Sequence, residues 1–446
     1  MGRLIPCLIT FGVLSATPLL SQATLPAGTP LVVSLDRNSP MHAGATLRGE
    51  LVYPVYADNK LVLPKGAVII GSVTALHPDR ARRRHAELGG DFTPFHTPEV
   101  QFDRIVQADS STLLVLSASV TDGAPIYRAV APAPIKGGLL HREFNAGWSA
   151  ARRDIGAFAA PGKGDRLLQF IYARLPYHPE RIEAGTAWTI ETTAAVEIPA
   201  AGVPAAPTPV LKRHFWDEPA PIQPAANNTR SWIVNAGLTD SVSSETSHTG
   251  QAIQAIVAEP IYTADHVLAV PQGAVLSGTV TRAKPSRSFG RAGVLSFNFT
   301  RLVLPASGTR TIETRLMGAD SAAQIALNSE GQVTSRPRDK ITIPLLLALM
   351  ASRPLDTDEG KAHAAHETAG KNATGGAAGL SLVGTIVAVA GGSPYVAAGI
   401  GYWGAARSFY ERWIAPGQKI VFPKDTRIVI ETTLRERSPL KPDSPQ

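Results

Sequence analysis

Short apolar stretches, separated by turns rich in Pro and Gly, recur along this chain. The block at residues 63–72 places Pro, a polar residue, Gly and Ala ahead of three strand-forming positions and a second Gly. The same pattern returns at residues 270–279. Short apolar runs bounded by turn residues are typical of β-strands. The recurrence therefore predicts a duplicated β structure, in which the turn residues of the two blocks are Pro64, Gly66, Gly71, Pro271, Gly273 and Gly278.

The strands around the two blocks also correspond. Residues 100–106 match 297–303, and the letters of 190–193 recur unchanged at 430–433. The offset between the copies is 207 residues at the repeated block, 197 at the next strand and 240 at the last. The first copy therefore has ten more residues after its block, and the second has 43 more before its last strand. Insertions of this kind fall on exposed faces of a repeated scaffold.

We predict a mainly β fold with two homologous domains, barrel- or sandwich-like, that carry helical insertions. The 39 Gly and 36 Pro, against 18% charged residues, favour a turn-rich β protein over a helical one. The expected segments, in chain order, are a signal peptide at 1–23, a first β domain at 24–196 with an insertion near 148–175, a Pro- and Ala-rich linker at 197–230, a second β domain at 231–437 with a helical insertion near 340–412, and a disordered tail at 438–446.

The N-terminus has the features of a secretory signal peptide. Arg3 precedes an apolar run at 4–20 and the small-residue sequence that ends at Ala23, where we expect cleavage. A retained membrane anchor is the alternative, although the run is short and holds two prolines. The only cysteine, Cys7, lies inside this segment, so the exported chain would form no disulfide and bind no metal through cysteine. We predict export to the periplasm or outer membrane of a bacterium.

The second insertion contains a segment without charge, residues 372–406, which is rich in Ala, Gly and Val. A Gly-Gly-Ser-Pro sequence at 391–394 divides it into halves of about a dozen apolar residues, fewer than the roughly 20 that a spanning helix needs. Two interpretations are open: a helical hairpin buried against the scaffold, or a hairpin that enters a membrane when several copies assemble. Its candidate membrane or partner contacts are Leu380, Val383, Ile386, Val389, Tyr395, Ile400 and Trp403.

The positive charges gather at corresponding places in the two copies. Lys and Arg exceed Asp and Glu by only 7, so we expect no specific nucleic-acid partner. However, a basic loop follows each repeated block. Such loops could contact a phosphate-bearing lipid or polysaccharide, and a solvated strand connection is the alternative. The candidate contacts are Arg80, Arg82, Arg83, Arg84, Arg282, Lys284, Arg287 and Arg291.

No catalytic or cofactor signature stands out. The chain has no Walker loop, no strand-linked dinucleotide fingerprint and no Gly-x-Ser-x-Gly nucleophile elbow. His363 and His366, followed by Glu367, lack the spacing of zinc proteases, so we interpret them as part of a solvated insertion. Glu191 and Glu431 recur with their strands and are structural candidates. We therefore expect no enzyme activity, no cofactor and no metal site.

Several short motifs resemble the TrbI-like family of conjugation and type IV secretion channel subunits. These are Pro-Ala-Gly-Thr at 26–29, the hydroxyl-Gly spacing from Ser243 to Gly250, the Pro-x-Gly-Ala block, the Phe-x-Arg strand, and Ile-Ala-Pro-Gly-Gln-Lys-Ile at 414–420. The resemblance implies an outer-membrane-associated β-barrel domain whose helical insertion helps to form a pore. The uncharged segment 372–406 lies at a comparable place, just before the last strand.

The chain also departs from that family. The family's membrane-bridging member has a cytoplasmic start, one inner-membrane helix and a single barrel domain, whereas this chain has a signal peptide and two copies. We expect an exported envelope scaffold or channel component that acts by assembly. Its expected partners are envelope proteins, further copies of itself as a homo-oligomer, and the outer membrane. The alternatives are an exported binding module for anionic surface glycan or lipid, and an exported hydrolase.

Overall fold

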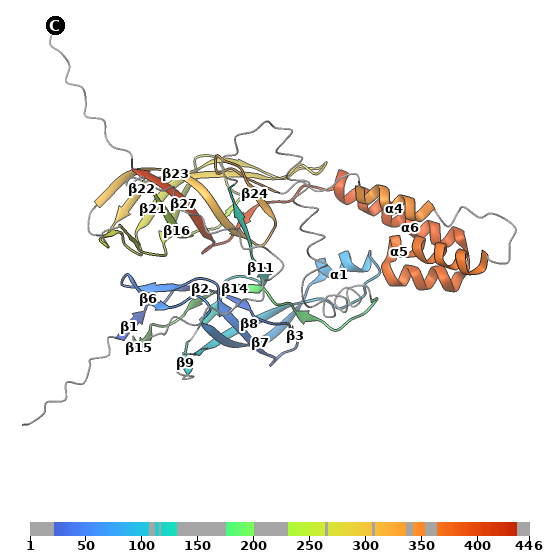
Figure 1. Cartoon of the computed structure of the whole chain (residues 1–446), viewed down its shortest axis with the longest axis horizontal. Helices are drawn as coiled ribbons and strands as arrows, with labels where there is room; N and C mark the ends of the chain where they lie inside the picture. Colours follow the sequence, from blue (N-terminus) through green and yellow to red (C-terminus); the bar gives the residue numbers. More distant parts are fainter. Residues whose placement is uncertain are drawn as a thin grey trace, which may run out of the picture.

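Two β units lie side by side, and a helical arm extends from one end of them (Figure 1). The fold is taken from a computed structural model of the chain. The residues it describes are 22–106, 112–115, 117–131, 175–199, 231–263, 266–305, 308–335, 342–352 and 364–434. The predicted signal peptide up to residue 21, most of the first insertion, most of the linker and the tail at 438–446 lie outside these residues.

The second unit is a closed barrel of six strands. Its strands are, in hydrogen-bonded order, β23 (Gly308–Ser321), β27 (Arg427–Leu434), β16 (Ser231–Leu238), β18 (Ala252–Val257), β21 (Val275–Lys284) and β22 (Val294–Leu304). Pairing of β22 with β23 closes the barrel. Short pairs flank it, namely β17 (Val242–Ser243) with β26 (Val421–Phe422), β19 (Ile261–Tyr262) with β20 (Leu268–Val270), and β24 (Ile325–Leu327) with β25 (Val333–Ser335).

The first unit repeats this strand order as a half-barrel. Its central strands are β14 (Thr186–Thr192), β2 (Pro30–Leu35), β4 (Thr46–Leu51), β7 (Val68–Pro78) and β8 (His96–Val106). Two short strands take the place of β23: β9 (Thr112–Leu114) pairs with β8, and β10 (Ser117–Ser119) pairs with β14. The smaller pairs are β1 (Gln22–Leu25) with β15 (Val196–Pro199), β3 (Ser39–Pro40) with β13 (Arg181–Ile182), β5 (Val55–Ala57) with β6 (Lys60–Leu63), and β11 (Ala124–Pro125) with β14.

One strand of the first copy belongs to the sheet of the second. β12 (Tyr127–Val130) pairs with the end of β23, from Gly318 to Ser321. The two units therefore share backbone hydrogen bonds. The mainly β fold with two homologous units and helical insertions is confirmed.

The repeated block forms the same turn in both units. Gly66 has a φ of 83° and Gly273 a φ of 79°, a conformation that glycine adopts without steric cost. The Gly66 N–H donates to the carbonyl of Leu51 at 2.8 Å, and the Gly273 N–H donates to that of Val257 at 2.9 Å. These bonds fix the start of β7 and β21.

The second glycine of each block allows two strands to approach closely. The strand register shifts next to Gly71 and next to Gly278. A Cβ at Gly71 would lie 2.3 Å from the carbonyl oxygen of Gln101, and one at Gly278 would lie 2.0 Å from that of Asn298. Both glycines are therefore needed for packing, in the same place of each copy.

Alternating burial along the strands gives each unit a core of its own. The residues of β18 alternate between exposed and buried, as the period of a half-buried strand requires. In the first core Phe102 packs against Trp188, with ring centroids 6.1 Å apart. In the second core Phe297 contacts Phe299 at 5.9 Å and Phe422 at 6.2 Å, edge to face.

The helices occupy the insertions. α4 (Thr342–Ser352), α5 (Ala364–Gly391), α6 (Pro394–Phe409) and the short π-helix η2 (Tyr410–Ile414) form the arm. α1 (Arg80–Glu87) lies in the first unit, between β7 and β8. The sequence had indicated only a polar loop there. Asp79 caps α1 by accepting a hydrogen bond from the Arg82 N–H at 2.9 Å.

Candidate functional site

The arm is held together by glycines at its helix crossings. A Cβ at Gly379 would lie 1.6 Å from the carbonyl oxygen of Ile400, and one at Gly404 would lie 2.0 Å from that of Ala378. Only glycine allows the backbones of α5 and α6 to come this close. The many glycines of the uncharged segment therefore make a compact helical unit.

The predicted helical hairpin has a second reversal that the sequence did not reveal. The break at residues 391–394 is confirmed, because α5 ends at Gly391 and α6 begins at Pro394. However, α5 is itself interrupted, with non-helical backbone at Leu380 and a positive φ at Ser381. The chain folds back there, which brings Gly376 next to Gly384: a Cβ at Gly376 would lie 2.1 Å from the carbonyl oxygen of Gly384.

This reversal changes how the arm could meet a membrane. Among the described residues one helical segment, Ala369–Gly391, is long and apolar enough to cross a bilayer, and only 22% of its most apolar window is buried. In this conformation the segment doubles back at Ser381 instead of running straight. The arm is thus a bundle of short helices with an exposed apolar surface.

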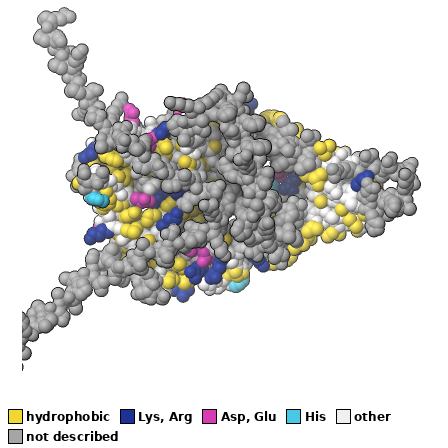
Figure 2. Space-filling model, viewed as in Figure 1, with side chains coloured by type: hydrophobic (Ala, Val, Ile, Leu, Met, Phe, Trp, Pro, Cys, Tyr) yellow, Lys and Arg dark blue, Asp and Glu magenta, His cyan; other side chains and the backbone are white. Residues whose placement is uncertain are grey.

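The candidate contact residues of the arm divide into two groups. Leu380, Val383 and Ile400 are half-buried: Ile400 packs against Gly379 of α5, and Leu380 lies beside Gly90 of the first unit. Four others are exposed, namely Ile386 (58%), Val389 (53%), Tyr395 (77%) and Trp403 (48%). Figure 2 shows that the visible face of the arm carries mostly hydrophobic and uncharged side chains.

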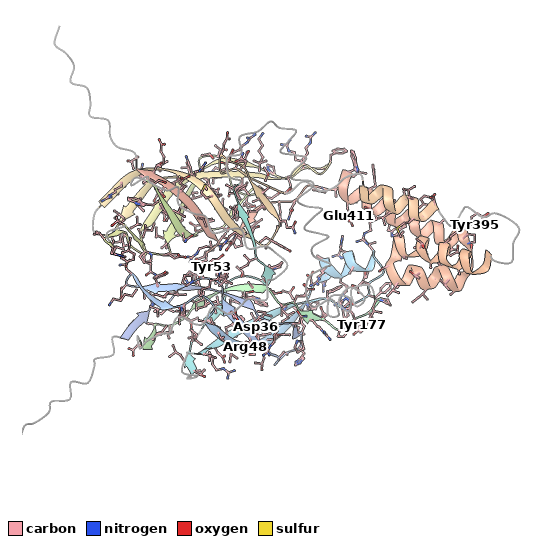
Figure 3. All side chains as sticks on the ribbon, in the orientation of Figure 1. Asp36, Arg48, Tyr53, Tyr177, Tyr395 and Glu411 are labelled. Atoms are coloured by element: carbon pink, nitrogen blue, oxygen red, sulfur yellow. The ribbon has the colours of Figure 1, made fainter. Side chains whose placement is uncertain are left out.

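The apolar surface also has an order from the free end of the arm to its base. Tyr395 lies at the free end and Glu411 at the base (Figure 3). Toward the base, exposed aliphatic side chains such as Val389 and Ile386 follow Tyr395, and a second group of aromatic ones lies along α6 and η2. The exposed aromatic residues of this second group are Tyr402, Trp403, Phe409, Tyr410 and Trp413.

α1 of the first unit forms hydrogen bonds with the base of the arm. Arg407 of α6 donates to the backbone carbonyl of His85 at 3.2 Å and to the Glu411 carboxylate at 2.9 Å. The indole N–H of Trp403 donates to the carbonyl of Leu88 at 3.5 Å. Hydrogen bonds across this contact give the arm a fixed attachment to the first unit as well as to its own.

A basic turn of the second unit supports the other side of the base. The Phe289 N–H donates to the carbonyl of Ile414 at 3.1 Å, and the Gly290 N–H donates to that of Ala415 at 3.0 Å. A shallow cavity of about 480 Å³ opens beside this turn; its lining is Ser286, Arg287, Ser288, Phe289, Arg291 and Pro416.

The eight predicted basic contacts are therefore placed by equivalent hairpins. Arg80, Arg82, Arg83 and Arg84 lie on α1, at the tip of the β7–β8 hairpin; Arg282, Lys284, Arg287 and Arg291 lie on or after β21, at the tip of the β21–β22 hairpin. All are exposed except Arg83, which is half-buried. Within the described residues no carboxylate forms an ion pair with any of the eight. The duplication brings both tips to the base of the arm.

A polar cluster between the two units was not foreseen from the sequence. Tyr53 of the first unit and Arg128 of β12, which faces Asp320 across the β12–β23 pair, both donate to the Asp320 carboxylate, with Arg128 at 3.0 Å (Figure 3 labels Tyr53). The guanidinium of Arg427 lies 4.7 Å from the Tyr53 ring centroid and also donates to Glu259 at 2.9 Å. Burial and the charge of Asp320 raise the pKa of the Tyr53 hydroxyl. The only signal was that Tyr53 stands where the second copy has Glu259, each before a proline.

The recurring glutamates of the last strands form ion pairs. Glu431 accepts from Arg315 at 3.1 Å within the second unit. Glu191 instead accepts from Lys424 of the other unit at 2.5 Å, and Asp425 lies beside this pair. Burial and a hydrogen bond with Glu191 raise the pKa of Asp425 to about 7. Among the described residues no cluster of three or more His, Cys, Asp or Glu could hold a metal ion.

Comparisons with known proteins add little to this geometry. No protein-family model matches the chain, and no curated protein matches it. A solved structure of ComB10, from the Com type IV secretion system of Helicobacter pylori, is similar at 14% identity, with 40% of this chain and 91% of that chain covered. The TM-score is 0.20, so the likeness is distant.

Proposed function

We propose that the protein is exported to the cell envelope of a bacterium and acts there by assembly, as a scaffold or channel component, without catalysis. The observation that carries this proposal is the apolar arm with its uncharged segment 372–406, which both β units contact at the base of the arm. In this role the β units set the position of the arm, and the arm makes the contact with a membrane or a partner protein.

The exposed apolar surface of the arm would be buried by a membrane or by a partner protein. Soluble monomers rarely expose large continuous apolar patches, and such patches mark protein or membrane contacts. Burying one large apolar side chain that would otherwise face water stabilises a contact by about 1.5–3 kcal/mol. Ile386, Val389 and Tyr395 together, at the free end, would therefore drive association. Other envelope proteins, further copies of this chain and the outer membrane are the proposed partners.

The sequence supports the same role. The N-terminal pattern of a signal peptide suggests export, and the motifs shared with the TrbI-like family suggest the outer barrel of a conjugation or type IV secretion channel. In addition, none of the sequence signatures considered above points to an enzyme.

A triple substitution at the free end tests the proposal. We expect Ile386→Gln, Val389→Gln and Tyr395→Gln together to release the protein from the envelope fraction and to abolish crosslinked oligomers, because the contact loses its apolar surface. Fractionation, crosslinking and particle imaging for a ring measure the result. The matched control is Leu61→Gln, Leu114→Gln and Val267→Gln, which replaces apolar residues of similar exposure (51%, 74% and 63%) on the β units. A soluble monomeric wild type, or a triple variant that still assembles, would contradict the proposal.

The second candidate is an exported binding module for an anionic glycan or lipid. The arginines of α1 favour it, since no described carboxylate pairs with them and a guanidinium binds phosphate or carboxylate in a bidentate manner. Deletion of residues 372–406 separates the two functions. A scaffold or channel component would lose assembly, whereas a module that binds through its basic tips would keep its ligand.

A further inference from the structure

We propose that the two basic hairpin tips form a collar that binds the phosphate groups of anionic phospholipids, while the arm contacts the apolar interior of the same membrane. The collar consists of Arg80, Arg82, Arg83, Arg84, Arg287 and Arg291. This inference rests on the proposed function, and it adds the chemical class of the membrane partner.

The surface of the arm has the order of groups that a membrane presents. From Tyr395 at the free end (Figure 3), exposed aliphatic residues such as Val389 and Ile386 come next. Aromatic residues of α6 and η2 follow, including Trp403, Tyr410 and Trp413. The collar lies beside the base, where α1 and the basic turn contact the arm. Trp and Tyr gather where hydrocarbon meets headgroups, and cations gather just outside that level.

The length of the arm fits this arrangement. α6 has 16 residues, which corresponds to about 24 Å of helix. The hydrocarbon core of a bilayer is about 30 Å thick. An arm that enters as far as its aromatic residues therefore stops inside the membrane, which leaves the collar at the phosphates of the leaflet that it entered.

The charges of α1 are poorly matched to the helix that carries them. Arg80, Arg82 and Arg83 stand in the first turn, which itself holds no acidic residue, so the three arginines outnumber the single carboxylate of the N-cap Asp79. The positive end of the helix dipole disfavours cations there. Arg82 packs over the Phe95 ring at 4.3 Å, and the first-turn arginines have no ion pair within the described residues. An external phosphate would relieve this repulsion.

A membrane fits the combined surface better than a nucleic acid does. Nucleic-acid phosphates would contact the collar alone and would leave the aliphatic end of the arm in water. A bilayer with anionic headgroups covers both parts at once, because its phosphates and its hydrocarbon lie at adjacent depths.

The test measures binding of the full chain to two kinds of vesicle at about 0.1 M salt, where charges about 10 Å apart still interact. One kind contains phosphatidylcholine alone, and the other also contains phosphatidylglycerol. The collar variant is Arg80→Gln with Arg84→Gln, since both are exposed and lie one turn apart on α1. Its matched control is Arg301→Gln with Arg310→Gln, which are exposed near the other end of β22, away from the basic turn.

We expect phosphatidylglycerol to strengthen binding of the wild type, and the affinity of the collar variant for these vesicles to be roughly 25-fold lower, at about fivefold per arginine. Binding to phosphatidylcholine should not change, and the control should lose much less. Equal affinity of wild type and collar variant, a loss no larger than the control's, or arginine-dependent binding to duplex DNA in place of vesicles would each overturn the inference. The triple variant of the arm tests the proposed function separately, because it should weaken binding to both vesicles alike.

Discussion

The two β units share a strand order but differ in closure. In the second unit β23 is a continuous strand of 14 residues that bonds to β22 and β27 and closes the barrel. In the first unit β9 and β10 take its place, with three residues each. The chain then crosses over, and β12 extends the sheet of the second unit. The segment that follows the open edge of the first unit thus connects the two units.

The tips of the equivalent hairpins also differ in structure between the two units. The first carries α1 and the second a tight basic turn, yet both hold the base of the arm through backbone carbonyls. The repeated strands fix where the tips lie, and the inserted residues decide what each tip does. The comparison therefore separates the strand geometry that both copies share from the contacts that each tip makes by itself.

The largest expected effect comes from equivalent core residues. Phe102 and Phe299 are both about 1% exposed and pack against the bulge glycine of their own copy. Phe102→Ala and Phe299→Ala should each lower the free energy of unfolding by about 3–5 kcal/mol, because each leaves a cavity. Guanidinium titration measures the loss. Equal losses would show that closure does not alter how a core tolerates a cavity, whereas a much smaller loss in the closed barrel would contradict the equivalence of the two cores.

A medium effect is expected where the units meet. Asp320→Asn removes the carboxylate that accepts from Tyr53 and Arg128, and it leaves a largely buried guanidinium without its counter-charge. We expect a loss of about 2–4 kcal/mol and the appearance of two unfolding transitions in calorimetry, one for each unit.

The control for this interface is Asp36→Asn. Asp36 pairs with Arg48 at 3.1 Å near the surface of the first unit (Figure 3). Such pairs contribute about 0–1 kcal/mol. A single, unshifted transition for Asp320→Asn would mean that β12 and the other contacts between the units, such as Lys424 with Glu191, couple them without this carboxylate.

The repeat could be predicted from sequence because its determinants are local. The turn at Gly66 and the bulge at Gly71 each depend on a few neighbouring residues, and the same pattern of residues occurs a second time in the chain. The uncharged segment was recognisable for the same reason, since the absence of charge is a property of composition. Thus the fold class and the place of the arm followed from patterns of fewer than about 40 residues.

The remaining features depend on contacts between distant parts of the chain. Gly376 and Gly384 meet where the chain reverses at Ser381, and the nearby Gly379 does not mark the reversal in the sequence because glycines recur throughout this segment. Tyr53 and Asp320 are 267 residues apart, so no periodicity connects them. α1 has an N-cap at Asp79, but its four arginines made this segment look like a polar loop in the sequence. Site residues could be proposed, whereas their meeting at the base of the arm required the structure.

The smallest effect concerns the second polar contact between the units. Burial and the hydrogen bond with Glu191 raise the pKa of Asp425 from 3.8 to about 7. Between these values the folded protein holds a proton that the unfolded chain releases, so stability falls as the pH rises from about 4 to about 7 and then levels off. Glu191, whose pKa is lowered chiefly by the hydrogen bond from Lys424, works in the opposite direction and reduces the net change.

Asp425→Asn isolates this contribution. Asp425 has a φ of 62°, which Asn also tolerates, and the introduced amide can still donate to Glu191. We expect the variant's stability relative to wild type to rise by on the order of 1 kcal/mol between pH 4 and pH 8, since only the wild type must release the proton. Thermal unfolding across this pH range measures it. Parallel stability curves would show that Asp425 titrates at its ordinary pKa, and the contact would then couple the units equally well at every pH in that range.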